Sequence, residues 1–269
     1  MRLLPLLAAS LSFMIAGSAA AKDDQKDEAI AEVVTASHRS AHFVARDSYR
    51  HPQEVLEFLG LEPGMTVVEI WPGGGYWTEM LAPYLRERGT YYTAISPPGA
   101  SERAANAAAN WRNKLESAPA LYSKVKVSEF GRGATEIAPA GSADTVVTFR
   151  NVHNWLSAGY AEEAFAAFFK ALKPGGILGV EEHRARTDQP QDPKASSGYV
   201  REDYVIELAK KAGFELVGRS DVLANPKDTK DWPRGVWTLP PTLALGDQDR
   251  DKYLAIGEAD NFLLKFRKP

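Results

Sequence analysis

The segment Val67–Thr78 reads VVEIWPGGGYWT and combines three structural signals in twelve residues. A short β-branched run, Thr66–Ile70, predicts a buried strand that ends beside the acidic Glu69. Glycines follow at 73–75, and glycine permits positive φ and close approach of the backbone to a bound molecule. A helix is expected from about Tyr76 to Arg86, and its first turn would offer free N–H groups to a carboxylate. Together these signals predict a ligand-binding turn.

Strands and helices alternate outward from this turn, which predicts an α/β fold. Further strands are expected at 89–95, 125–129, 143–149, 177–182, 214–222 and 262–266. Helices are expected at 52–59, 101–117, 160–172 and 202–212. Gly60 and Ser101 stand where a C-cap and an N-cap belong. We therefore expect a mostly parallel seven-stranded sheet with helices on both faces.

Two polar, proline-containing stretches, 184–200 and 223–260, interrupt this alternation. Loops of such length inside a compact domain are often functional. Both leave the carboxyl ends of predicted strands, the edge where open α/β sheets bind ligands. Surface decoration is the alternative for 184–200, whereas Trp232 and Trp237 among prolines favour a folded lid for 223–260. We expect one domain, 52–269, with these two insertions.

The N-terminus predicts export. Arg2 precedes the apolar run Leu3–Ile15 and a group of small residues at 16–21, a pattern typical of a secretory signal peptide over residues 1–21. An uncleaved anchor is the alternative, but the run is shorter than the roughly 20 residues of a spanning helix. No later stretch approaches that length, so we expect no stable membrane insertion after signal removal. The mature protein would be periplasmic or secreted, with a helical flap at 22–51.

Composition narrows the classes of partner. Hydrophobic residues make up 44% and charged residues 25% of the chain, as in a globular domain. The net charge of −3 offers no reason to expect a nucleic-acid partner. The absence of cysteine excludes disulfides, thiolate metal sites and cysteine nucleophiles. A small-molecule partner is expected, and the sequence does not indicate an oligomeric state.

Further short motifs follow one another in a characteristic order and spacing. LKPGG (172–176) leads into the strand 177–182, and SADTVV (142–147) is followed by RNVHNW (150–155). With VEIWPGGGYWTEMLAPYL (68–85) and FRNVHNW (149–155), the chain from about residue 50 onward resembles the class I S-adenosylmethionine-dependent methyltransferases. Within them it is similar to a group of exported bacterial predicted methyltransferases. The resemblance implies a Rossmann-like fold, S-adenosylmethionine as cofactor and methyl transfer to a small molecule.

The resemblance also implies cofactor contacts by position. The residues it selects are Glu69, Trp71, Gly73, Gly75, Ser96, Glu129, Phe130, Arg150 and Asn151. Gly73 and Gly75 match glycines at the methionine portion of the cofactor. Glu129 and Phe130 match the strand end where the family holds the adenine, and Arg150 and Asn151 lie beside the methyl group.

Two positions depart from the family pattern. Trp71 stands at the family's first glycine, and because Pro72 follows it, we expect Trp71 to be extended and to lengthen the strand by one residue. The family's acid for the ribose hydroxyls is missing, and Ser96 is the nearest polar substitute. Ribose recognition should therefore differ from that of the family.

His153 and His183 follow the predicted strands 143–149 and 177–182 at the ligand-binding edge. Either histidine can take a proton from an acceptor hydroxyl, since histidine titrates near neutral pH. A structural role, with the ring satisfied by loop backbone, is the alternative. Glu181, Glu182 and His183 also suggest a metal site, but consecutive strand residues point to opposite faces. We therefore expect no metal.

A second function class stays open. An exported, non-catalytic ligand-binding protein could retain a degenerate methyltransferase fold, and the missing ribose acid favours this alternative. So does export, because the cofactor is made in the cytoplasm. A dinucleotide oxidoreductase is disfavoured, because Thr78 occupies the third glycine position of a G-x-G-x-x-G motif.

Overall fold

The structure is a computed structural model that describes residues 27–269. The predicted signal peptide (1–21) and the first residues of the predicted flap lie outside this range. No helix within 27–269 is long and apolar enough to cross a membrane.

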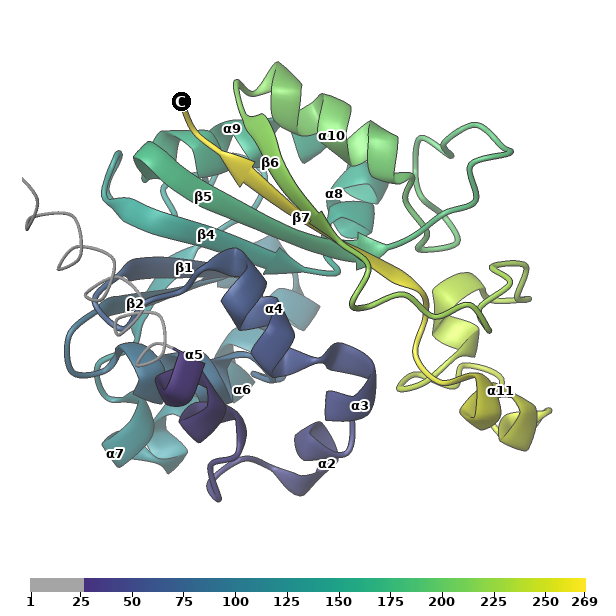
Figure 1. Ribbon diagram of the computed structural model, residues 1–269, viewed down its shortest axis with the longest axis horizontal. Coiled ribbons are helices and arrows are strands. Elements are labelled where there is room, and N and C mark those ends of the chain that lie inside the picture. The colour runs from purple at the N-terminus through teal and green to yellow at the C-terminus, as the bar shows by residue number, and fades with distance from the viewer. Residues whose placement is uncertain (1–26) are drawn as a thin grey trace, which may run out of the picture.

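A seven-stranded sheet in the order β3-β2-β1-β4-β5-β7-β6 forms the centre of the fold (Figure 1). β7 is antiparallel to both of its neighbours, and the other pairs are parallel. The strands are β1 (Thr66–Ile70), β2 (Thr90–Ile95), β3 (Lys126–Glu129), β4 (Ala143–Phe149), β5 (Leu172–His183), β6 (Glu215–Ser220) and β7 (Asn261–Arg267). The predicted mostly parallel seven-stranded sheet is confirmed.

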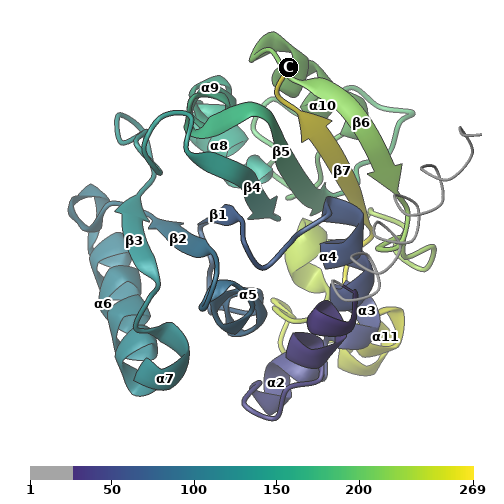
Figure 2. The same ribbon diagram turned by 60° about the vertical axis from the view of Figure 1, so that its left-hand side comes forward.

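Helices cover both faces of the sheet (Figure 2). One face carries α4 (Pro52–Leu59), α5 (Thr78–Leu85), α6 (Glu102–Ser117) and α7 (Pro119–Tyr122), with the turn η1 (Pro98–Ala100) before α6. The other carries α8 (Val152–Ala158), α9 (Ala161–Ala171) and α10 (Glu202–Lys211). Two apolar clusters fill the space between these layers and the sheet, one on each face.

The remaining elements gather beyond the carboxyl ends of the parallel strands (Figure 1). They are α2 (Ala41–Val44), α3 (Asp47–Arg50), η2 (Gly235–Thr238) and α11 (Arg250–Ile256), and residues 27–34 are also helical. A third apolar cluster, which includes Tyr199, Val236 and Tyr253, joins the two insertions into one packed unit. The edge that binds ligands in open α/β sheets is therefore partly roofed.

Local signals account for the helix ends. Pro52 begins α4, and Gly60 ends it at φ +76°, a left-handed conformation that glycine adopts without strain. The Ser101 hydroxyl accepts the Ala104 N–H at 3.1 Å and caps α6. The helix α8 was not predicted, because its seven residues span too few turns for a helical period to be recognised.

Candidate active site

Two cavities meet at the glycine turn after β1. The first, called here the arginine cavity, has a volume of about 260 Å³ and is lined by Arg46, Arg50 and Arg150 among others. The second, the α6 cavity, has a volume of about 490 Å³ and lies between the turn and helix α6. Both are lined by Trp71, Pro72, Gly73 and Asn151. A ligand that crosses the turn could therefore occupy both.

Trp71 is not extended, so the expectation of a longer strand is wrong. Its φ is +50°, and β1 ends at Ile70. The Trp71 N–H still donates to the Ala94 carbonyl at 2.9 Å, and the chain then turns at once, as it would at a glycine. A non-glycine residue in this region costs on the order of 1 kcal/mol. The indole offsets that cost, because its Nε1 donates to the Phe130 carbonyl at 2.9 Å and its ring packs against Trp155.

The glycines of the turn have different surroundings. Gly73 has φ +59°, and a Cβ added there would meet no atom within 4 Å, so its open side faces the cavities that it lines. A Cβ on Gly75 would lie 2.4 Å from Lys114 Cε, and Gly75 lines neither cavity. Gly73 is thus the glycine that faces ligand space, and Gly75 allows α6 to pack closely.

Glu69 lines the arginine cavity and is 1% exposed. Its Oε2 accepts a hydrogen bond from Thr78 Oγ1 at 2.7 Å and another from the Tyr91 hydroxyl. Burial raises the pKa of Glu69 to about 7, although both hydrogen bonds oppose that rise. Glu69 therefore titrates near neutral pH.

The three arginines that line the arginine cavity belong to one ion network. Glu258, in the second insertion, accepts two hydrogen bonds from Arg46 at 2.5 and 3.0 Å and one from Arg150 at 2.7 Å. Glu181 on β5 lies 3.3 Å from Arg50 Nη2 and 3.6 Å from Arg150 Nε. Burial alone would raise the pKa of Glu258, but the hydrogen bond from Arg46 and the charge of Arg150 outweigh it and lower that pKa to about 2.

Two buried donors in this cavity lack a partner among the described residues. They are Arg50 Nε and Trp77 Nε1, on side chains whose residues are 4% and 2% exposed. An unpaired buried donor is costly, on the order of 1–3 kcal/mol. Arg50 also lies over the Tyr76 ring, 4.2 Å from its centre, which fixes the guanidinium. The cavity is therefore equipped to receive ligand oxygens.

Two buried histidines face the same cavity. His153 Nδ1 lies 3.0 Å from Glu182 Oε1, and His183 Nδ1 lies 2.7 Å from Asn261 Oδ1. Their ring centres are 5.5 Å apart. Because these oxygens accept an Nδ1–H, the Nε2 lone pair of each ring remains available. Burial lowers the pKa of His183 to about 3, so this ring stays neutral at ordinary pH.

Glu182 joins the histidines in a way that the strand pattern did not predict. Its carboxylate accepts the backbone N–H groups of His153 and His183 as well as the His153 ring hydrogen. Possible ligand atoms of these three residues lie within 4.8 Å of one another, close enough for one metal ion. The alternation of strand faces therefore does not exclude a metal, because the Glu182 carboxylate folds back toward its own neighbour. The absence of metal stays a prediction.

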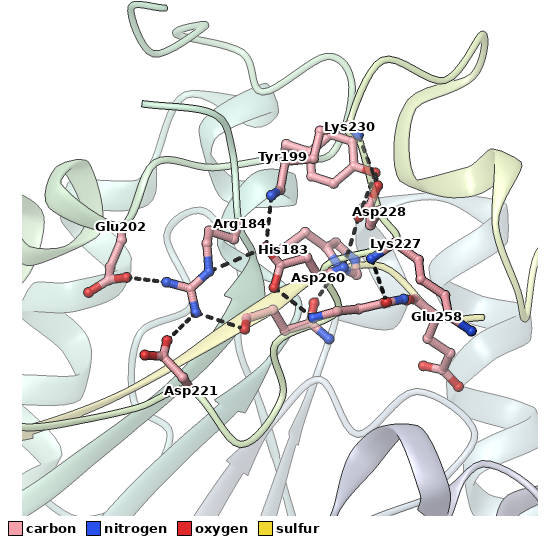
Figure 3. Close-up of polar contacts among 12 residues, drawn as sticks. His183, Arg184, Tyr199, Glu202, Asp221, Lys227, Asp228, Lys230, Glu258 and Asp260 are labelled. Atoms are coloured by element: carbon pink, nitrogen blue, oxygen red, sulfur yellow. Dashed lines mark hydrogen bonds and ion pairs between the residues drawn. The ribbon is translucent and has the colours of Figure 1, made fainter. Parts of the chain in front are cut away.

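The two insertions are joined by a polar cluster around Asp228 (Figure 3). Its carboxylate accepts hydrogen bonds from the Tyr199 hydroxyl at 2.8 Å and from Trp232 Nε1 at 2.7 Å. Trp232 thus packs and bonds within the insertion, whereas Trp237 is 37% exposed and lines the arginine cavity 6.0 Å from the His153 ring. The two tryptophans have different surroundings, although the sequence assigned them one role.

Most of the sequence-predicted residues come together. Those that line a cavity are Glu69, Trp71, Gly73, Ser96, Arg150, Asn151, His153 and His183. Gly75, Glu129 and Phe130 line neither: Glu129 is exposed and Phe130 is fully buried. The predicted site residues do not include Arg46, Arg50 and Glu258, which belong to one ion network. The charged residues just before Pro52 include Arg46 and Arg50 and are the local sign of this network.

Comparisons with known proteins agree with this geometry. A family profile described as "Methyltransferase domain" matches residues 41–218. A search of curated proteins finds no match. Among solved structures, an S-adenosylmethionine-dependent methyltransferase from Aquifex aeolicus is similar at a TM-score of 0.55 and 18% identity, over 84% of this chain and 93% of that one. The 4+2 cyclase SpnF is similar at a TM-score of 0.54 and 20% identity, over 87% and 83%.

Proposed function

Because the chain belongs to the methyltransferase-domain family, whose cofactor is S-adenosylmethionine, we propose that it methylates a small-molecule acceptor bound in the arginine cavity. The observation that carries this proposal is the buried pair His153–Glu182, joined at 3.0 Å on the wall of that cavity. A positioned base beside a small cavity suits an acceptor that must lose a proton.

The residues present fit the methionine end of the cofactor. S-adenosylmethionine supplies a methyl group on a positively charged sulfur and carries a carboxylate. Arg50 Nε and Trp77 Nε1 are buried donors without partners among the described residues, and they suit carboxylate oxygens. Gly73 leaves open space between the two cavities, where a side chain would intrude. These three residues would hold that end of the cofactor.

The base is His153 rather than His183. Glu182 accepts the His153 Nδ1–H and stabilises the positive ring that forms when Nε2 takes the acceptor's proton. His183 is held neutral by burial, with a pKa of about 3, and its Nδ1–H is fixed on Asn261. His183 therefore positions the acceptor. The remaining contribution of the protein is alignment of the reacting atoms.

The cavity walls suggest the class of acceptor. Phe149, Trp237, Pro240 and Pro241 supply apolar surface, and the histidines and arginines supply polar groups. A volume of about 260 Å³ limits the occupant to a small molecule. We infer a small, partly apolar or aromatic acceptor with an ionisable hydroxyl.

The two insertion tryptophans test this acceptor site. Trp237→Ala should weaken acceptor turnover at least severalfold while changing stability by less than about 1 kcal/mol, because the ring is partly exposed on the cavity wall. Trp232→Ala is the matched control. It removes a packed ring that donates to Asp228, so it should cost roughly 3 kcal/mol of stability. Urea unfolding and labelled-methyl transfer measure the two effects, and equal stability losses in both variants would contradict a wall role for Trp237.

Two alternatives to methyl transfer each have one observation in their favour. SpnF has a similar fold and is described as a cyclase, so the fold alone does not fix the reaction. Trp71 at a glycine position also keeps the non-catalytic ligand-binding alternative open. Transfer of a labelled methyl group to any acceptor excludes both alternatives.

Export belongs to the same proposal. The signal-like pattern of residues 1–21 supports a mature chain that begins at Lys22 in the periplasm or medium. Sequencing the N-terminus of protein from cell fractions checks this, and a cytosolic chain that retains Met1 would contradict it.

A further inference from the structure

We propose that the α6 cavity is a slot for the purine of the cofactor, with the Trp71 indole as one wall and the alanines of α6 as the other. This proposal rests on the proposed function, because it takes S-adenosylmethionine as the ligand. It differs from the sequence-based assignment of the adenine to Glu129 and Phe130.

Trp71 packs against Phe130, which follows the end of β3. Trp71 Nε1 donates to the Phe130 carbonyl at 2.9 Å, and the indole packs against the rings of Phe130 and Trp155, at 6.1 and 6.0 Å from their centres. Phe130 is 0% exposed, and Glu129 lines neither cavity. The Phe130 ring is therefore not available to stack on a purine while the indole stays in place.

The same contacts present the indole to the α6 cavity. Trp71 is held through its Nε1 and its packing on two core rings, yet it lines both cavities. Its backbone keeps a φ of +50° that a glycine would adopt at no cost. Strain of this kind at a cavity wall points to a role for the side chain that causes it.

The opposite wall is made of small side chains. Ala104, Ala107 and Ala108 lie on one side of α6 and line the cavity, and Trp111 follows one turn later. Trp111 Nε1 donates to Thr93 Oγ1 at 3.1 Å, which fixes that ring. A flat heterocycle fits between an indole and a row of methyl groups. Stacking of a base on an aromatic side chain contributes roughly 1–3 kcal/mol.

Polar groups and size also favour this occupant. Ser96, at the end of β2, and Asn154, on α8, line the cavity and offer a hydroxyl and an amide to a ribose or a purine edge. Its volume of about 490 Å³ exceeds the 260 Å³ of the arginine cavity. Pro72, Gly73 and Asn151 border both cavities, so a ligand with its ring here can extend past the turn into the cavity that Arg50 lines.

Calorimetric binding of S-adenosylhomocysteine to the purified full chain tests the slot. Trp71→Ala should weaken binding by about 5- to 150-fold, the equivalent of the stacking energy, and Trp71→Phe should retain most of the affinity. Ala107→Phe, at an exposed position, should fill the slot and weaken binding at least tenfold. Ala105→Phe is the matched control: it is exposed on the same helix, lines neither cavity and should bind as wild type does.

The outcomes separate the slot from the proposed function. If Trp71→Ala binds more tightly than wild type, the indole blocks the cavity, and the assignment of the purine to it is overturned. If wild type binds but Ala107→Phe binds equally well, the purine lies elsewhere and the slot is overturned, while the function stands. If folded wild type binds neither S-adenosylhomocysteine nor adenosine, both fail. Thermal melting of each variant confirms that it is folded.

Discussion

Glu258→Gln is expected to lower the free energy of unfolding by about 3–5 kcal/mol, because it leaves Arg46 and Arg150 without their shared carboxylate in a buried network. The glutamate is 3% exposed and links the second insertion to the segment before α3 and to the turn after β4. Urea unfolding at pH 7 measures the loss. Glu215→Gln, which breaks the exposed ion pair with Arg267, is the matched control and should cost less than about 1 kcal/mol.

The pH dependence of this difference follows from the lowered pKa of Glu258. The group titrates near 4.5 in the unfolded chain and at about 2 when folded, so the folded state stabilises the carboxylate. That contribution is complete above pH 4.5 and is lost as the pH falls toward 2; it amounts to roughly 3 kcal/mol. The gap between wild type and Glu258→Gln should therefore narrow below pH 4.5. A gap that stays constant from pH 7 to pH 3 would contradict the network.

His153→Ala is expected to reduce methyl transfer by about 100- to 10,000-fold, the usual contribution of a positioned base. The acceptor for this assay comes from screening small phenols and hydroxy acids with S-adenosylmethionine labelled in the methyl group. Affinity for S-adenosylhomocysteine should stay within about twofold, since the ring bonds Glu182 and faces the acceptor side of the cavity. His42→Ala, at an exposed histidine outside both cavities, is the control and should leave turnover unchanged.

Two results would remove His153 from the role of base. One is undiminished turnover in His153→Ala. The other is loss of wild-type turnover after treatment with a chelator, with recovery on addition of one divalent cation. That second result would make His153, Glu182 and His183 metal ligands, which their proximity allows.

The sheet could be predicted because its signals are local. The β-branched run Thr66–Ile70 is β1 to the residue, and Ala143–Phe149 is β4. The caps Gly60 and Ser101 follow from conformational and hydrogen-bonding preferences that hold in any context. β5 begins at Leu172, earlier than the predicted residue 177, because Ala143 pairs with Leu172 before a register shift between β4 and β5. The Lys-Pro-Gly-Gly sequence after Leu172 does not indicate this pairing.

The site could be predicted only in part, because its geometry depends on long-range contacts. The turn and the two histidines are visible as residues that follow strands. Arg46 and Glu258 are 212 positions apart, and nothing local pairs them. The conformation of Trp71 is held by the hydrogen bond from its indole to the Phe130 carbonyl. The Trp-Pro dipeptide does not predict this partner. The fold of the Glu182 carboxylate toward His153 is likewise a tertiary contact.

A thermal-shift titration of the full chain with S-adenosylhomocysteine tests whether the glycine turn binds the cofactor. At 100 times the dissociation constant the ligand should add about 2.7 kcal/mol to the stability of wild type. Gly73→Val should abolish this gain, because its side chain would enter the space between the cavities. Gly133→Val carries a similar backbone strain, with φ +73° and open surroundings outside both cavities, and should keep the gain. Folded wild type that gains no stability at millimolar ligand would contradict cofactor binding at this turn.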